Sequence, residues 1–223
     1  LIATSFYFPK FCVSFGNFRI EFIMQSVENK IYKKIKYGGK GKIYFSNDFV
    51  KYGPPESITK ALTTLNKKEI LLRLTRGIYL YPRFSELLNQ ILYPSLDTIA
   101  KEIAKRDKTR IVPTGVQALN MLGLSTQVVV NAVYLTDGSP RRIKIGGGKG
   151  ILFIHTAPKN LAYKSDLIML VVSALKEIGE GNVSSKEIEI IKAPLTKYET
   201  KESILRDIEL APVWVRKILL TMI

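Results

Sequence analysis

The sequence contains very few of the residues on which most enzyme chemistry depends. Cys12 is the only cysteine and His155 the only histidine among 223 residues. A lone cysteine excludes a disulfide within the chain and a thiolate metal cluster, and a lone histidine excludes a zinc site built on a histidine pair. Ser-His-Asp triads and Cys-His dyads of the usual kind are disfavoured for the same reason. We therefore predict that the protein is not an enzyme and holds no metal or cofactor.

Acidic residues are also scarce. The chain has 34 lysines and arginines against 19 acidic residues, a formal net charge of +15. Residues 24–85 carry 13 of the basic residues and only 4 acidic ones, so most of the surplus lies in a short part of the chain. Concentrated positive charge indicates a dedicated module for a polyanionic partner. At 46% hydrophobic residues, the chain can also bury a real core.

Residues 1–23 have neither the continuous apolar run of a membrane span nor the order of a secretory signal. They hold six of the ten phenylalanines without a helical or alternating period, and Pro9 and Gly16 interrupt them. We interpret them as an extension before a native start at Met24. The alternative is an aromatic arm that packs on the body. The protein is expected in the cytoplasm, with no membrane partner.

From Met24 the hydrophobic period predicts a helix over Gln25–Lys36 and a strand over Lys42–Phe45. A second short helix follows, with Ser46 as its N-cap. Gly53-Pro54-Pro55 ends that helix and begins a third, whose apolar stripe consists of Ile58, Ala61, Leu62 and Leu65.

The segments "ILLRLT" and "IYLYP" flank Arg76-Gly77 and predict a tight β-hairpin. Helix, strand, helix, helix and hairpin form the order of a winged helix-turn-helix, which we assign to residues 24–85.

The rest of the chain predicts an α+β domain over residues 86–179 and a helical segment over 180–223. A helix over Leu96–Lys108, the strand "TRIVP" and the helix "TGVQALNMLGL" come first. Three strands in "VVVNAVYLTDG", "RRIKIGGG" and "GILFIHTAP" then predict a small antiparallel sheet, a β-meander. The remaining helices are expected at Leu167–Ile178 and around 185–192, 199–209 and 213–222. The predicted class is α+β.

The third helix of the basic module is the predicted reader of DNA. A recognition helix presents short hydrogen-bonding side chains and cations to the major groove. A helix face that is only solvated would usually mix Glu with Lys. Here the acidic residues occur only at the two ends of the helix, at Glu56 and Glu69. The predicted DNA-binding residues on this helix and the hairpin are Ser57, Thr59, Lys60, Thr63, Thr64, Lys67, Arg73 and Arg76. The lysines of "KIYKKIKYGGKGK" are expected to contact phosphates.

A second basic cluster is either another nucleic-acid surface or a solvated strand face. Its members are Arg141, Arg142, Lys144 and Lys149. "GGGKG" at 146–150 lacks the Ser or Thr of a phosphate-binding loop and is interpreted as a hairpin turn. His155 is expected to be a surface or hydrogen-bonded residue, and Trp214 a core residue. Thr114, Gln117 and Asn120 are expected in structural roles, with an antitoxin surface as the alternative.

The segments "RGIYLYPRFS", "IVPTGVQALNMLGLSTQV" and "VYLTDGSPRRIKIGG" resemble the AbiEi-type antitoxins of type IV toxin–antitoxin (abortive infection) systems. The resemblance covers roughly residues 24–179. It implies an N-terminal winged helix that binds operator DNA, and a C-terminal antitoxin domain that opposes a nucleotidyltransferase-like toxin without a stable complex. The lead of 23 residues and the helical tail depart from the family pattern.

The sequence therefore predicts a DNA-binding transcriptional regulator, an AbiEi-like antitoxin that represses its own operon. Because one winged helix rarely gives enough specificity, two copies or two domains are expected on double-stranded operator DNA, with a homodimer or cooperative binding as the means. The alternative is an RNA-binding or translational regulator that uses the basic sheet. A nuclease or nucleotide-transfer enzyme would need paired carboxylates for a metal, but none occur from Ser139 to Ser165.

Overall fold

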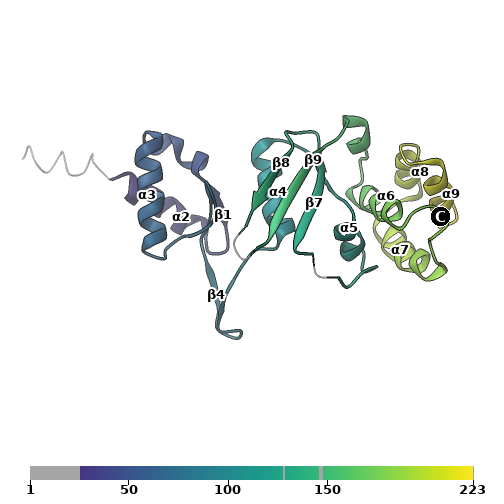
Figure 1. Cartoon of the computed structure of the whole chain (residues 1–223), viewed down its shortest axis with the longest axis horizontal. Coiled ribbons are helices and arrows are strands. Elements are labelled where there is room, and N and C mark those ends of the chain that lie inside the picture. The colour runs from purple at the N-terminus through teal and green to yellow at the C-terminus, as the bar shows by residue number, and fades with distance from the viewer. Residues whose placement is uncertain (1–25, 128, 146–147, 223) are drawn as a thin grey trace, which may run out of the picture. The chain divides into compact units, whose positions relative to one another are not determined.

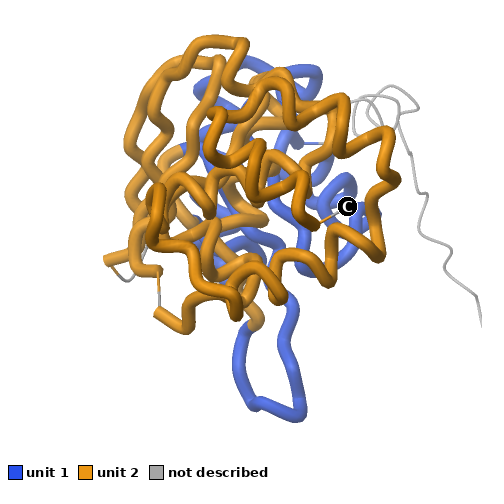
Figure 2. The backbone as a smooth tube through the Cα atoms, turned by 90° about the vertical axis from the view of Figure 1, so that its right-hand side faces the viewer, with its two compact units in different colours: residues 1–73, 77–91 blue, residues 74–76, 92–223 orange. Residues whose placement is uncertain are grey.

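The computed structural model describes residues 26–127, 129–145 and 148–222, so the predictions for residues 1–23 lie outside it (Figure 1). The described chain forms two compact units, residues 26–73 with 77–91 and residues 74–76 with 92–222 (Figure 2). The predicted α+β class is confirmed. In the described part, no helix combines the length and the apolar character needed to cross a bilayer.

Residues 26–80, nearly all of them in the first unit, contain the predicted order of elements. α2 (Val27–Gly38) and β1 (Ile43–Phe45) are followed by the 3₁₀ helix η1 (Ser46–Tyr52), α3 (Pro55–Lys67), β2 (Leu72–Thr75) and β3 (Ile78–Leu80). The strands form a sheet of order β1-β3-β2, in which β1 and β3 are antiparallel. The helices enclose a core that includes Ile31, Ile35, Phe49, Ile58 and Leu62, all buried.

Two local details differ from the prediction. The second helix is a 3₁₀ helix, and its N-cap is Phe45 and not Ser46. The backbone N–H of Phe45 donates to Asp48 Oδ2 at 2.8 Å, so the Asp48 carboxylate in the first turn satisfies the N–H of the N-cap residue.

Gly38 ends α2 where another side chain comes very close. The Tyr44 hydroxyl crosses the helix end and donates to the Ile35 carbonyl at 3.2 Å. A Cβ atom added to Gly38 would overlap this hydroxyl oxygen, so the position requires a glycine while Tyr44 keeps its place.

The second unit is built on a four-stranded sheet. α4 (Leu96–Asp107), β6 (Ile111–Pro113) and α5 (Val116–Met121) precede β7 (Asn131–Thr136), β8 (Arg141–Lys144) and β9 (Gly150–His155). The prediction of an antiparallel meander is wrong. The strand order is β6-β7-β9-β8, and β9 runs parallel to β7 while β6 and β8 pair antiparallel at the edges.

Burial explains this order. β9 is "GILFIH", an almost continuous apolar run, and three of its six residues are buried. β8 is "RRIK" and has no fully buried residue. A charged strand is stable at a sheet edge, where its side chains reach water, whereas an apolar strand gains more from a central place.

Helices follow the sheet and share one core. η2 (Pro158–Leu161) leads to α6 (Asp166–Ile178), α7 (Ser185–Tyr198), α8 (Lys201–Ile208) and α9 (Val213–Leu220). α7 extends past the predicted end near residue 192 and includes Pro194. Buried residues of α6 pack in one cluster with those of α7, α8 and α9, and Trp214 lies partly buried against that cluster. This shared core spans residue 179, where the sequence predicted a boundary, and residues 92–222 belong to one compact unit.

A buried carboxylate fastens α8 to the start of α6. Asp207 is 1% exposed. Its Oδ2 accepts the backbone N–H groups of Lys164 at 2.8 Å and Ser165 at 2.7 Å, and its Oδ1 accepts from Arg206 Nε at 2.9 Å. Burial alone would raise the pKa of Asp207, but the Ser165 N–H and the Arg206 guanidinium stabilise the anion, so the pKa lies below its usual value.

Candidate nucleic-acid interface

The orientation of α3 is set by its apolar stripe. Ile58, Ala61, Leu62 and Leu65 are all buried against the core of the first unit. Because side chains three and four residues apart share one side of a helix, this packing leaves the opposite side facing solvent. Thr59, Lys60, Thr63 and Lys67 are exposed there, and Ser57 and Thr64 are half-buried at its margins.

The threonine hydroxyls on this face all donate to the preceding turn. Thr59 Oγ1 donates to the Pro55 carbonyl at 2.8 Å, Thr63 Oγ1 to the Thr59 carbonyl at 2.8 Å, and Thr64 Oγ1 to the Lys60 carbonyl at 3.0 Å. With their protons engaged, these oxygens offer lone pairs, and the side chains offer methyl groups. Such a surface can accept from adenine or cytosine amino groups and contact thymine methyls.

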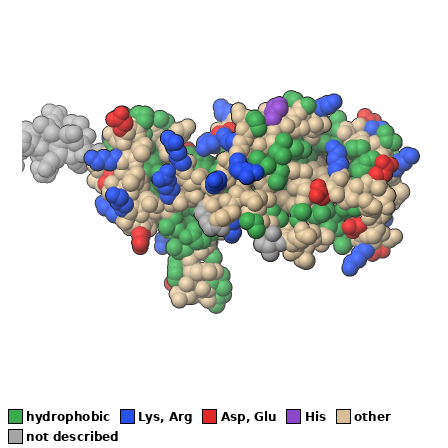
Figure 3. Space-filling view, viewed as in Figure 1, with side chains coloured by type: hydrophobic (Ala, Val, Ile, Leu, Met, Phe, Trp, Pro, Cys, Tyr) green, Lys and Arg blue, Asp and Glu red, His purple; other side chains and the backbone are tan. Residues whose placement is uncertain are grey.

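The lysines of α3 supply the positive charge. In the part of the chain that the structure describes, neither Lys60 nor Lys67 has an ion pair, whereas Lys68 beside them binds Glu28 at 2.7 Å. The exposed face of α3 therefore carries uncompensated positive charge between Glu56 and Glu69. Figure 3 shows lysine and arginine side chains over this unit, with few acidic ones.

The hairpin that follows α3 is tied to the end of that helix. Asn66 Oδ1 accepts the backbone N–H of Arg73 at 2.9 Å. At the turn, Gly77 adopts a φ of 74°, and its carbonyl accepts the N–H of Ser46 at 3.1 Å. Arg73 and Arg76 are both exposed. The sequence pattern gave no sign of the role of Asn66, because its partner is identified only by the fold.

The lysines of α2 and the following loop are not equivalent. Lys34 is half-buried, donates to the Asp48 carbonyl at 2.5 Å and lies 5.0 Å from the centroid of the Phe49 ring. It is held by the core of its own unit. Lys33, Lys36 and Lys40 are exposed and can reach a phosphate backbone.

The second basic cluster is divided by the strand that carries it. In β8, Arg142 and Lys144 are exposed, while Arg141 alternates to the other side. Arg141 binds the Asp107 carboxylate and lies 5.4 Å from the centroid of the Phe153 ring. Burial would raise the pKa of Asp107, but hydrogen bonds from Arg106 and Arg141 lower it overall, which is the sign of a structural ion pair. Arg141 therefore has a partner within its own unit, whereas Arg142 and Lys144 face solvent, and a second nucleic-acid surface on this strand stays a prediction.

Residues of the central motif have internal partners. The Asn120 side chain donates to the Gln127 carbonyl at 2.5 Å. The Tyr134 hydroxyl donates to Asp97 at 3.0 Å, and burial together with this carboxylate raises the pKa of Tyr134 far above its usual value. His155 is exposed and lies 3.1 Å from the Gly138 carbonyl. The Asn120 contact is the kind expected of a structural residue, and the roles of Thr114 and Gln117 stay predictions.

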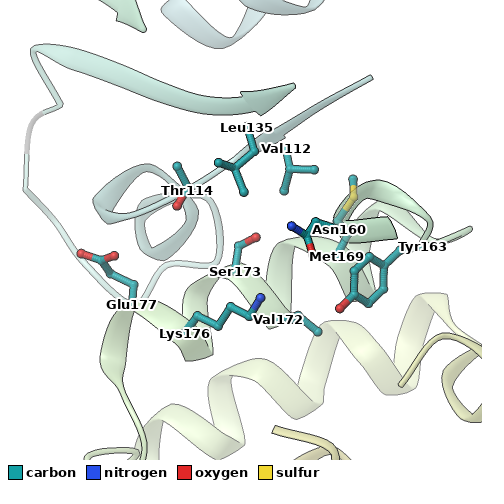
Figure 4. Close-up of a pocket in the computed structure, with 10 residues that line it drawn as sticks. All are labelled: Val112, Thr114, Leu135, Asn160, Tyr163, Met169, Val172, Ser173, Lys176 and Glu177. Atoms are coloured by element: carbon teal, nitrogen blue, oxygen red, sulfur yellow. The ribbon is translucent and has the colours of Figure 1, made fainter. Parts of the chain in front are cut away.

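A small pocket, which no sequence motif indicated, lies between β6, η2 and α6 (Figure 4). Its volume is about 120 Å³. Its polar residues include Thr114, Asn160, Ser173 and Lys176, and the Lys176 side chain extends below Ser173 (Figure 4). Pockets for cofactor-sized ligands have volumes of roughly 300–1,000 Å³, so this one accommodates a few waters or a small ion. Among residues 26–127, 129–145 and 148–222, no three His, Cys, Asp or Glu side chains gather as a metal site.

Comparison with known proteins identifies a family and no curated relative. The model of a protein family described as "Family of unknown function (DUF6088)" matches residues 30–204. That range covers most of the chain and includes all of α3 and all of the four-stranded sheet. No curated protein matches the chain.

Proposed function

We propose that this chain, which belongs to the DUF6088 family of unknown function, is a DNA-binding transcriptional regulator. The observation that carries this proposal is the exposed face of α3. Thr59, Lys60 and Thr63 lie there without a carboxylate between them, on a helix whose other side is buried. Such a face fits the major groove, where short polar side chains meet base edges and lysines meet phosphates.

The elements around α3 support a winged-helix docking mode. The order of helix, strand, 3₁₀ helix, helix and hairpin matches that motif, and in the β1-β3-β2 sheet the hairpin strand β3 pairs with β1. In this mode α3 enters the groove and the hairpin contacts the flanking backbone. Asn66, which joins α3 to the Arg73 backbone, would then fix the angle between the recognition helix α3 and the β2–β3 hairpin.

The resemblance to AbiEi-type antitoxins supports a more specific form of the proposal. The DNA would be the operator of the chain's own operon. The second unit would oppose a nucleotidyltransferase-like toxin, which need not bind it stably. Two copies on a repeated site would supply the specificity that one α3 helix lacks.

Fluorescence anisotropy tests the proposal directly. The full chain is titrated against a labelled duplex from upstream of its own gene, with a scrambled duplex and a matched RNA as competitors, over a series of salt concentrations. We expect preference for the upstream duplex. The double substitution Lys60→Ala with Thr63→Ala should weaken that binding by roughly 10–100-fold, the loss of one or two base or phosphate contacts. It should also reduce the slope of log K against log salt by about 1.

The chain contains a matched control for this substitution. On α7, Lys192 and Thr196 are exposed, and Thr196 Oγ1 donates to the Lys192 carbonyl at 2.9 Å, as Thr64 does to Lys60. Lys192→Ala with Thr196→Ala removes the same charge and hydroxyl from another helix and should leave binding unchanged. Equal affinity of the α3 variant and the wild type would refute the assignment of α3. A preference for RNA that survives the α3 substitution would favour the basic sheet instead.

A further inference from the structure

An apolar β-arm follows the hairpin of the first unit. β4 (Arg83–Ser85) and β5 (Gln90–Leu92) form a two-stranded sheet of their own. It stands out from the rest of its unit in two perpendicular views (Figures 1 and 2). A hairpin of two strands is only marginally stable in water on its own, and both of its outer edges have unpaired backbone groups. Such an arm gains stability when another surface covers it.

The side chains of the arm are those of an interface. Leu87 is 93% exposed, Leu88 57% and Phe84 51%. Figure 3 shows apolar side chains along the arm. Its only charged residues are Arg83 and Glu86, whose charges cancel. On a chain with a net charge of +15, this is a neutral and apolar element, and exposed apolar patches of this kind mark sites of association.

The base of the arm borders a groove of about 360 Å³. Its lining is mostly apolar, with Tyr32, Ile70, Tyr81, Phe84 and Ile91, and the charged residues Lys40 and Glu69 also border it. The first unit therefore presents an apolar projection, at Leu87 and Leu88, and a mostly apolar recess at the foot of that projection.

We propose that two copies of the chain associate through their arms. Antiparallel pairing of two arms about a two-fold axis places the tip of each arm beside the base of the other. Leu87 and Leu88 of one copy then lie in the groove bordered by Tyr32 and Ile70 of its partner, and the reciprocal contact forms at the same time. A two-fold contact of this kind is closed and joins two copies only.

Charge favours a second copy over other occupants. A nucleic acid or an anionic lipid surface would be bound by cations, and the arm has none beyond Arg83, which Glu86 offsets. Two basic chains would repel each other across most surfaces, but two neutral arms can approach without that cost.

The area is that of a weak dimer. If a fully exposed leucine or phenylalanine offers on the order of 170 Å², Phe84, Leu87, Leu88 and Leu92 expose roughly 400 Å² in each copy. A symmetric pair would bury about 800 Å² from these side chains, and the groove lining and strand backbones add to it. Interfaces near 1,000 Å² are typical of weak association, so we expect dissociation in the micromolar range.

Sedimentation velocity on the full chain without DNA tests this inference, so its outcome is independent of the proposed DNA binding. Wild type should shift from monomer to dimer as its concentration rises through the micromolar range. Leu87→Asp with Leu88→Asp should weaken the dimer at least tenfold. The control is Leu205→Asp with Val213→Asp, two apolar residues of α8 and α9 that are 41% and 66% exposed, and it should dimerise normally. Circular dichroism checks that each variant is folded.

Cysteine pairs test the tip-to-base arrangement. In a Cys12→Ser background, Glu86→Cys at the tip and Lys40→Cys at the groove should form a mixed disulfide when the two variants are combined, in excess of either homodimer. Wild type that stays monomeric up to about 100 µM, far above the range expected for this area, would overturn the proposal. Equal dimerisation of the arm variant, or homodimeric disulfides alone, would do the same. So would arm-dependent binding of a monomer to phosphatidylglycerol vesicles.

Discussion

Replacement of Asp207 tests how the C-terminal helices are joined to the sheet domain. In Asp207→Ala, the backbone N–H groups of Lys164 and Ser165 lose their acceptor, and Arg206 loses its partner. A buried donor left without an acceptor costs about 1–3 kcal/mol, so we expect the two unpaired backbone N–H groups together to lower the free energy of unfolding by about 3 kcal/mol. For a domain of this size that is a decrease in Tm of roughly 6–12 °C.

Urea unfolding followed by far-UV circular dichroism measures this loss. Asp107→Ala is the matched control, because Asp107 also binds arginine but its side chain is 24% exposed, against 2% for Asp207. Solvated ion pairs contribute about 0–1 kcal/mol, so this control should change the free energy of unfolding much less. A loss below about 1 kcal/mol for Asp207→Ala would refute the reasoning, since it would mean that these donors find water instead.

The pH dependence gives a second, independent test. The pKa of Asp207 is lowered in the folded state, so its contribution to stability is full above the unfolded value of about 3.9 and is lost as the pH falls through the folded pKa. Asp207→Asn has no such titration. The difference in unfolding free energy between wild type and Asp207→Asn should therefore narrow in acid. A difference that stays constant from neutral pH to well below about pH 4 would contradict the lowered pKa.

Three further substitutions test other contacts. Asn66→Ala removes the acceptor of the Arg73 N–H, so the free energy of unfolding should fall by about 1 kcal/mol. Affinity for the upstream duplex, measured by anisotropy, should fall several-fold. Unchanged affinity would mean that the link between α3 and the hairpin does not affect DNA binding. Gly38→Ala should lower the free energy of unfolding by about 1–3 kcal/mol, because the new Cβ overlaps the Tyr44 hydroxyl. Tyr44→Phe added to this variant should restore part of the lost stability. If it restores none, the overlap with the Tyr44 hydroxyl is not the cause of the loss. Arg141→Ala should lower Tm without changing the slope of log K against log salt for DNA binding, because Arg141 binds Asp107. A shallower slope would mean that Arg141 contacts the nucleic acid.

The sequence by itself determined the elements whose signals are local. The stripe on α3 is encoded by four residues within two turns, and it fixed both the helix and the side that faces solvent. The turn at Gly77 needs a positive φ, which a glycine supplies, so the β2–β3 hairpin was also predictable. The concentration of charge in residues 24–85 is a sum over the sequence and needs no fold.

Only the tertiary structure decided which residues meet across the chain. The strand order β6-β7-β9-β8 was missed because sheet order depends on which strands gain most from burial, a comparison among segments that a local period cannot make. The ion pair of Arg141 with Asp107 could not be predicted, because the two residues are 34 positions apart in the sequence. The exposed apolar arm of β4 and β5 could not be predicted, because leucine and phenylalanine taken one residue at a time indicate a core. Their exposure depends on how many neighbours the fold brings within reach, and that number is a property of packing alone.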